Sequence, residues 1–310
     1  MSQMDQQYQT SSPVLFLVFN RPHTTEKVFR AIREARPSRL YVAADGPRED
    51  RDGEAELSQE TRRVATNVDW NCQVNTLFRT SNLGCKRAVS SGIDWFFEHE
   101  AEGIILEDDC LPSMSFFRFC DELLSYYRGD SRVGMISGHN KKQRWRCSEA
   151  DYFFSHFGGI WGWATWRRAW ANMDVELTRL NDAVRAKSLR HLLGWQRGRA
   201  REETLLHAID HVDTWDYQWT FARNIGNQIS CVPCTSLIEN IGFGADATHT
   251  TTQSTRGGTA EELSFPLRHN TIMVADSEYD ELFVPVSAPP VEALRRLKRR
   301  VRRCCAKSAW

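Results

Sequence analysis

The chain has 310 residues, 41% of them hydrophobic, and its 40 Lys and Arg balance its 40 Asp and Glu. The charge is uneven: residues 291–310 carry eight Lys or Arg and one Glu, a net +7, which leaves −7 on residues 1–290. An acidic body of this kind excludes a nucleic-acid-binding domain, which would carry a basic face.

No apolar run reaches the roughly 20 residues that a membrane-spanning helix needs. The first 12 residues are polar and lack the apolar core of a signal peptide. We therefore expect a cytoplasmic protein.

Strand and helix patterns alternate along the first 140 residues. Continuous apolar, β-prone runs such as PVLFLVFN are typical of strands buried on both faces, and the segments between them show helical spacing. This alternation predicts an α/β fold with a Rossmann-like, mostly parallel central sheet, helices on both faces and a single large domain. The predicted strands are 13–20, 39–45, 72–79, 103–106 and 132–140, and the predicted helices are 23–36, 57–68, 84–99 and 114–127.

The pattern changes after residue 140. Residues 160–170, IWGWATWRRAW, hold four of the eleven Trp, of which we expect Trp166 and Trp170 in the core and Trp161 and Trp163 at a loop rim. Beyond them we predict helices in 175–212 and 214–226 and a strand at 228–240. The predicted domain covers 13–250, divided at about 140, and is followed by an irregular extension at 251–290.

The basic tail at 291–310 repeats apolar residues at helical spacing among its eight cations. Two interpretations stay open: an amphipathic helix on the anionic inner face of a membrane, or a disordered basic tail. The first would make the protein a peripheral membrane protein.

Three adjacent acids, Glu107, Asp108 and Asp109, end the fourth predicted strand. They are either a cap for the next helix or a functional site, and we favour the site because ligands of open α/β sheets bind at the carboxyl ends of the strands. Strand alternation would place Glu107 and Asp109 on one side and Asp108 on the other. Carboxylate oxygens suit a hard divalent cation, Mn²⁺ or Mg²⁺.

Polar residues also follow the other strands, at Asn20-Arg21, Asp45 and Arg79. The chain has neither GxGxxG nor GxxxxGK[ST]. A bound nucleotide would therefore need a metal to balance much of its phosphate charge.

These blocks resemble the GT-A fold of nucleotide-sugar glycosyltransferases, in most detail the N-acetylglucosaminyltransferase I type. The blocks FNRP, AADG, EDDCLPSMSFF, WGWATW, WDYQW and FGADATH are similar to that type's blocks and stand in the same order over about 13–250. Bacterial sugar transferases share the first half of this pattern. The segment between WGW and WDYQW is longer here than in that type.

The resemblance implies roles for single residues, and it implies a glycosyltransferase that inverts the sugar's anomeric centre. Asp216 corresponds to that type's catalytic base, which accepts the acceptor's proton. Asp213 is the alternative, because the spacing of WDYQW differs from that type's Trp-Asp-Asp-Trp. For the donor, the implied roles are contact with the nucleoside base for Arg21 and Asp45, contact with the ribose for Asp108, and metal binding for Asp109. His249 would bind metal on a loop that closes over the diphosphate. On the acceptor side, Asp216 would be the catalytic base and Trp163 would help shape the site.

Further candidates come from the residues alone. Arg79, Asn82 and Lys86 flank the helix that Gly84 opens, where a phosphate is attracted, although a solvated surface explains Lys86 equally well. His139 ends the fifth strand and either contacts the sugar or is a plain strand-end residue. With Asn20, Glu107 and Trp161, these complete the predicted site.

We therefore expect transfer of a sugar, most naturally from a UDP-sugar, to a hydroxyl of a glycan, a lipid-linked acceptor or a protein. A divalent cation stabilises the leaving diphosphate in such chemistry, and a carboxylate takes the acceptor's proton. The alternatives are a sugar-1-phosphate nucleotidylyltransferase, against which the glycine-free VFNRPHTT argues, and a non-catalytic nucleotide- or carbohydrate-binding module.

Overall fold

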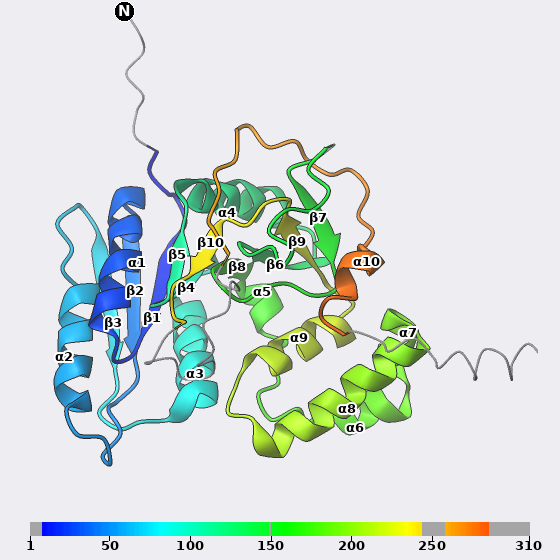
Figure 1. The fold of residues 1–310 in the computed structure, drawn as a ribbon, viewed down its shortest axis with the longest axis horizontal. Coiled ribbons are helices and arrows are strands. Elements are labelled where there is room, and N and C mark those ends of the chain that lie inside the picture. The colour runs from blue at the N-terminus through cyan, green and yellow to red at the C-terminus, as the bar shows by residue number, and fades with distance from the viewer. Residues whose placement is uncertain (1–7, 149, 244–257, 285–310) are drawn as a thin grey trace, which may run out of the picture.

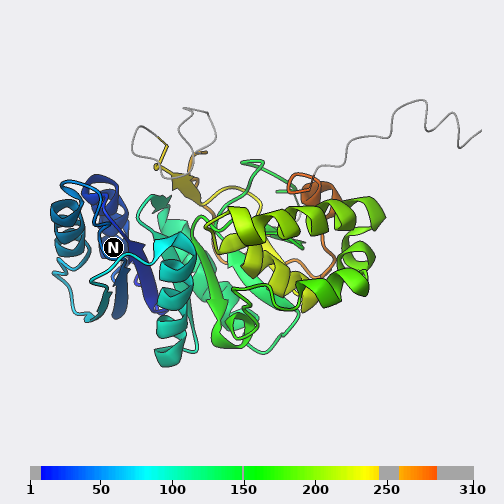
Figure 2. The same ribbon diagram turned by 90° about the horizontal axis from the view of Figure 1, so that it is seen from below.

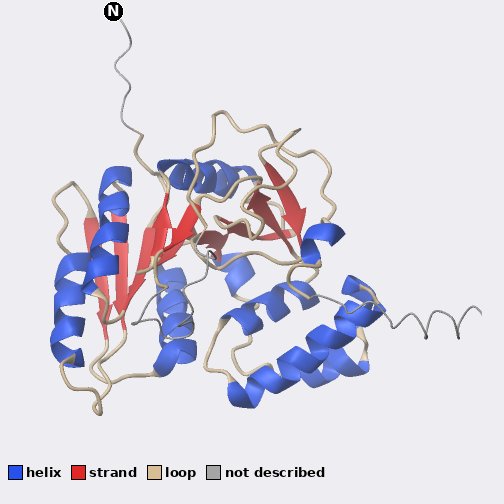
Figure 3. Cartoon of the chain, in the orientation of Figure 1, coloured by secondary structure: helices blue, strands red, loops and turns tan. Residues whose placement is uncertain are grey.

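An eight-stranded sheet with the order β3-β2-β1-β4-β8-β6-β9-β7 forms the centre of the protein (Figures 1 and 3). The computed structural model describes residues 8–148, 150–243 and 258–284. Strands β8 and β7 run antiparallel to their neighbours, and the other pairings in the sheet are parallel. The predicted fold class, α/β with a mostly parallel sheet, is confirmed.

The strands belong to the main sheet and to a small second sheet, and the helices lie between or after them along the chain. The strands are β1 (Val14–Val18), β2 (Arg39–Ala44), β3 (Gln73–Phe78), β4 (Glu102–Glu107), β5 (Cys110–Pro112), β6 (Val133–Ser137), β7 (Tyr152–Ser155), β8 (Trp163–Trp166), β9 (Ile229–Pro233) and β10 (Ile238–Asn240). The helices are α1 (Pro22–Ala35), α2 (Glu54–Ala65), α3 (Gly84–His99), α4 (Met114–Tyr126), α5 (Arg167–Trp170), α6 (Leu180–Arg185), α7 (Ser188–Leu193), α8 (Trp195–His211), α9 (Asp216–Ile225) and α10 (Ser277–Asp280).

Alternate residues of β1 face two separate cores. Val14 and Phe16 pack with apolar residues of α1 and α4, whereas Leu15 and Leu17 pack with those of α3, α5 and α9. All five β1 residues are buried, as expected of a central strand covered on both faces. This two-sided burial is why the sequence shows a continuous apolar run there.

The parallel register brings the carboxyl ends of the first strands together. Val18 lies opposite Ala44, Ala44 opposite Phe78, and Leu17 opposite Glu107. The residues that follow these strands therefore meet at one edge of the sheet, as the sequence predicted.

The second half contains strands that the sequence analysis missed. WATW (163–166) is strand β8, inserted antiparallel between β4 and β6, and β7 was not predicted. The predicted strand at 228–240 is two strands in different sheets, because β10 leaves the main sheet and pairs with β5 (Figure 2). Strands of three or four residues are too short to show a recognisable period.

Two further regions complete the described chain. Helices α6–α8 form a group beside the sheet (Figure 1), with Leu180, Leu189, Leu205 and Phe221 in its core. Residues 258–284 return along α4 and β7, where the Leu263 amide donates to Ser115 and the Asp276 amide to the Phe154 carbonyl. No described helix combines the length and apolarity that crossing a membrane requires, and residues 291–310, the predicted basic tail, lie outside the described residues.

Candidate functional site

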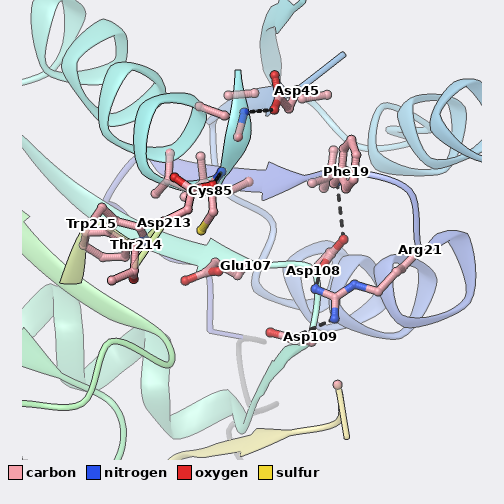
Figure 4. Close-up of a pocket in the computed structure, with 18 of the residues that line it drawn as sticks. Phe19, Arg21, Asp45, Cys85, Glu107, Asp108, Asp109, Asp213, Thr214 and Trp215 are labelled. Atoms are coloured by element: carbon pink, nitrogen blue, oxygen red, sulfur yellow. Dashed lines mark hydrogen bonds and ion pairs between the residues drawn. The ribbon is translucent and has the colours of Figure 1, made fainter. Parts of the chain in front are cut away.

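A cavity of about 470 Å³ opens at the carboxyl ends of β1, β2 and β4. Figure 4 shows the acidic triplet at its centre, with Arg21 on one side and Asp213, Thr214 and Trp215 on the other. Residues of both halves of the chain therefore form its walls. The predicted residues that line it are Arg21, Asp45, Arg79, Asn82, Glu107, Asp108, Asp109, Trp161 and Asp213.

Arg21 bridges two acids of the triplet. One guanidinium nitrogen donates to Asp109 Oδ2 at 3.0 Å, and the other donates to Asp108 Oδ1. The predicted alternation of the triplet is wrong, because β4 ends at Glu107 and residues 108–109 form a turn. The turn places Asp108 and Asp109 within reach of the same guanidinium and leaves Glu107 apart from them.

Burial and the neighbouring acids raise the pKa of two carboxyls of the triplet, those of Glu107 and Asp108. Burial raises the pKa of Glu107 most, and the charges of Asp109 and Asp108 add to the increase. Burial likewise raises the pKa of Asp108, although Arg21 opposes it. A divalent cation or the positive end of a ligand would relieve this crowding of negative charge.

Asp45 holds the start of α3 in place. Its carboxylate accepts hydrogen bonds from the Leu83 amide at 3.0 Å, the Gly84 amide at 3.2 Å and the Asn82 side chain at 3.0 Å. Arg79 donates to Ser91 Oγ at 2.7 Å. These residues form one wall of the cavity, and their predicted ligand contacts stay predictions.

Asp213 and Asp216 occupy different environments. Asp213 accepts from the amides of Cys85 at 2.9 Å and Lys86 at 3.1 Å, so it caps α3 from the opposite half of the chain. Asp216 is the first residue of α9, accepts from the Thr214 hydroxyl and lies behind the cavity wall. Both candidate bases are therefore already hydrogen-bonded.

The two predicted acceptor-site tryptophans lie in different environments, one at the cavity and one in the core. Trp161 lines the cavity, with its ring 5.7 Å from that of Phe243. Trp163 is fully buried and packs on Trp215 at 5.6 Å between ring centroids and on Trp219 at 5.7 Å. The predicted loop-rim position of Trp163 is wrong, because strand β8 turns this side chain into the core. Its role in shaping the acceptor site stays a prediction.

Three other predicted residues lie outside the cavity lining. Asn20 donates to Glu54 at 2.8 Å, which positions the loop after β1. The Lys86 side chain is not part of the lining, although its amide binds Asp213. His139 packs behind Trp161 with ring centroids 4.4 Å apart, and burial lowers its pKa to about 4. Contact of His139 with a sugar stays a prediction.

Several lining residues were missed by the sequence analysis. Phe19 and Arg48 form part of the wall, with the Arg48 guanidinium 5.5 Å from the Phe19 ring centre, and Arg48 also pairs with Glu54. Phe19 directly precedes Asn20 and Arg48 follows Asp45 by three residues, which is the signal that could have found them. Trp215 and Phe243 belong to the WDYQW and FGADATH blocks, from which other residues were singled out. Cys85, Thr214, Asn240 and Gly242 also line the cavity and come together through the tertiary fold.

Gly242 lies directly against the Asp109 side chain. A Cβ at this position would lie 2.3 Å from Asp109 Oδ2, so only glycine leaves room for the carboxylate. Loop 240–243 therefore fixes the orientation of Asp109.

A divalent cation fits this site only with help from a ligand. Among residues 8–148, 150–243 and 258–284, no group of three or more His, Cys, Asp and Glu is arranged as a metal cage. Mg²⁺ often binds one or two carboxylates and takes its other ligands from phosphate and water, and Asp109, partly exposed at the cavity, suits that mode. His249, the other predicted metal ligand, lies outside the described residues.

Comparisons with known proteins give only remote structural likenesses. The chain matches no protein-family profile and no curated protein. A UDP-glucose pyrophosphorylase complexed with UDP-glucose aligns at 7% identity with a TM-score of 0.38, over 73% of this chain and 91% of that one. The 4-diphosphocytidyl-2C-methyl-D-erythritol synthase of Anaerococcus prevotii aligns at 8% identity with a TM-score of 0.38, over 78% and 94%.

These likenesses do not confirm the resemblance to glycosyltransferases. At such low identity and TM-score they also give no argument for the activity of the proteins they name. The function must therefore be argued from the site.

Replacing Trp163 by Ala should lower the free energy of unfolding by about 3–5 kcal/mol, because it leaves a cavity in the aromatic core. Trp161→Ala should cost only about 1 kcal/mol, since this side chain is half-exposed. Urea unfolding monitored by circular dichroism measures both. Equal losses for the two variants would contradict the assignment of Trp163 to the core.

His139 should make the protein less stable in acid. Its pKa is about 4 in the folded chain against an ordinary 6.5, so between these pH values only the unfolded chain binds the proton. Stability therefore falls as the pH drops through this window, by up to roughly 3 kcal/mol.

The matched variant His139→Gln should lose this part of the pH dependence. The measurement is the free energy of unfolding in urea at pH 7 and pH 4.5 for both proteins. The same decrease in the two proteins would show that His139 is not the group responsible.

Proposed function

We propose that the chain is a glycosyltransferase that moves a sugar from a nucleoside diphosphate, UDP being the first candidate, to an acceptor hydroxyl. The observation that carries the proposal is the shared cavity: Asp45, Arg21 and the acidic triplet face Thr214, Trp215 and Trp161 across one space. A donor would bind to the N-terminal half, and an acceptor would enter from the wall formed by the C-terminal half.

The residues divide the chemistry among them. Phe19 and Arg48 offer an apolar and cationic surface to the donor's nucleobase. Arg21 and Arg79 offer positive charge to its phosphates. Asp109 would hold a divalent cation, which when bound supplies Lewis-acid stabilisation of the leaving diphosphate. Trp161 and Phe243 give the acceptor an aromatic contact surface, as sugar faces commonly use.

Proton removal from the acceptor falls to Asp216 or Asp213. Within the described part of the chain, Asp216 accepts a hydrogen bond from the Thr214 hydroxyl, which can rotate away, whereas Asp213 is bonded to two backbone amides that cannot. We therefore favour Asp216, which a shift of the Thr214–Trp215 wall would open to the cavity.

A sugar-1-phosphate nucleotidylyltransferase is the second candidate, and one observation favours it. Both candidate bases are engaged, and a phosphate oxygen, unlike a hydroxyl, attacks without needing a base. The loop after β1 argues against it, because Pro22 lacks an N–H and Arg21 is bound to the triplet. That loop therefore offers few donors to a triphosphate.

Asp216→Asn should lower the rate of sugar transfer about 100-fold or more, the usual effect of losing a general base. Nucleotide binding should stay within about twofold of the wild type. Asp213→Asn is the matched control and should act mainly on stability, because Asp213 caps α3. The rate follows from nucleoside diphosphate release, and binding from calorimetry. A larger rate loss in Asp213→Asn would exchange the two roles.

The two candidate reactions release different products, which ³¹P NMR separates. With a nucleoside diphosphate sugar and Mn²⁺, a glycosyltransferase should slowly release nucleoside diphosphate even without acceptor. A nucleotidylyltransferase should instead form nucleoside triphosphate when pyrophosphate is added.

Binding can be tested apart from turnover. A nucleotide at a hundred times its dissociation constant should stabilise the wild type by about 2.7 kcal/mol, and Asp109→Ala should lose the metal-dependent part. Binding without either reaction would indicate a binding module. No stabilisation by any nucleotide would refute both enzyme proposals.

A further inference from the structure

The contact between Arg21 and the triplet occupies the oxygens that a cation would need. Asp109 Oδ2 accepts from Arg21 at 3.0 Å, and Asp109 Oδ1 lies 3.4 Å from the Cys110 thiol, which donates to it. Asp108 Oδ1 accepts from Arg21, and Asp108 Oδ2 is 3.4 Å from the Phe19 amide. Each of the four oxygens therefore already has a donor, and Gly242 fixes the position of Asp109.

Charge makes this contact hard to replace by metal alone. The guanidinium keeps its charge at any working pH, and it lies against carboxylates whose side chains are only 3% and 17% exposed. A divalent cation at Asp109 would meet a fixed positive charge at close range in a poorly solvated site. Poor solvation strengthens this repulsion relative to water.

A diphosphate would remove the conflict. It brings negative charge to the same place and offers the planar guanidinium a bidentate partner, which arginine prefers. The other cations of the cavity wall are held elsewhere, Arg48 by Glu54 and Arg79 by Ser91. Within the described residues, Arg21 is thus the cation in direct contact with the triplet.

We propose that Arg21 is the resident counter-ion of Asp108 and Asp109 and keeps divalent cations out until a diphosphate takes over its guanidinium. Metal and nucleotide then bind cooperatively, because the bound nucleotide raises the affinity for the metal and the bound metal raises the affinity for the nucleotide. The nucleotide part rests on the proposed function. The exclusion of metal from the empty site does not.

The test is Mn²⁺ binding, measured by the electron paramagnetic resonance signal of free Mn²⁺. Without nucleotide, Arg21→Gln should bind Mn²⁺ at least about tenfold more tightly than the wild type, since a full charge close to the oxygens is gone. Adding Asp109→Asn to this variant should abolish the gain. Arg128→Gln, which removes an arginine paired with Glu102 at the opposite end of β4, is the matched control and should bind Mn²⁺ as the wild type does.

Arg21→Lys keeps the charge but cannot bridge both carboxylates, so it should show a smaller gain. It also serves as the second variant if Arg21→Gln folds poorly. Melting temperatures give an independent measurement: Mn²⁺ should stabilise Arg21→Gln more than it stabilises the wild type. Unchanged or weaker Mn²⁺ binding in both variants would overturn the proposal.

A second titration adds UDP, CDP, GDP or ADP. In the wild type, one of these should tighten Mn²⁺ binding at least about tenfold, and in Arg21→Gln this coupling should shrink. Equal coupling in both proteins would overturn the cooperative part. If no nucleotide binds the wild type by calorimetry, the proposed function fails, while the nucleotide-free comparison still decides the role of Arg21.

Discussion

The ion pair between Arg21 and the acids at the end of β4 is the interaction on which the site depends. A buried strand that ends in three carboxylates concentrates negative charge at the carboxyl edge of the sheet. One guanidinium from the neighbouring strand end balances part of it, and it reaches Asp108 and Asp109 together only because the chain turns there. Burial and the neighbouring acids keep the pKa values of Glu107 and Asp108 raised in spite of it, so one guanidinium does not balance the whole charge.

The start of α3 ties the two halves of the chain together across the same cavity. Asp45 from the end of β2 binds the amides of Leu83 and Gly84, while Asp213 from the loop before α9 binds the next two. A helix N-terminus that offered four free amides to a phosphate would be an anion site. Here two carboxylates of the chain take that place, so the amides at the start of α3 are already engaged.

The tryptophans of the second half differ in position, since some pack in the core and Trp161 lines the cavity. Trp163 and Trp219 pack in the core together with Trp215, which also lines the cavity, whereas Trp161 lines the cavity with the His139 ring beside it. This group packs against the segment that carries Asp213 and against the start of α9, where Asp216 lies. Packing in the second half therefore sets the positions of both candidate bases of the proposed function.

The sequence by itself determined the first half of the protein. Continuous apolar strands alternate there with helices of full length, so their periods are readable, and parallel strands necessarily bring Arg21, Asp45, Arg79 and the acidic triplet to one edge. Tertiary structure decided the rest. The short strand β8 has no period to read, so Trp163 in the core and Trp161 at the opening look alike in sequence. The partners of Arg21 and of Asp213 depend on a two-residue turn and on a contact 128 residues apart, and local sequence carries no signal for either.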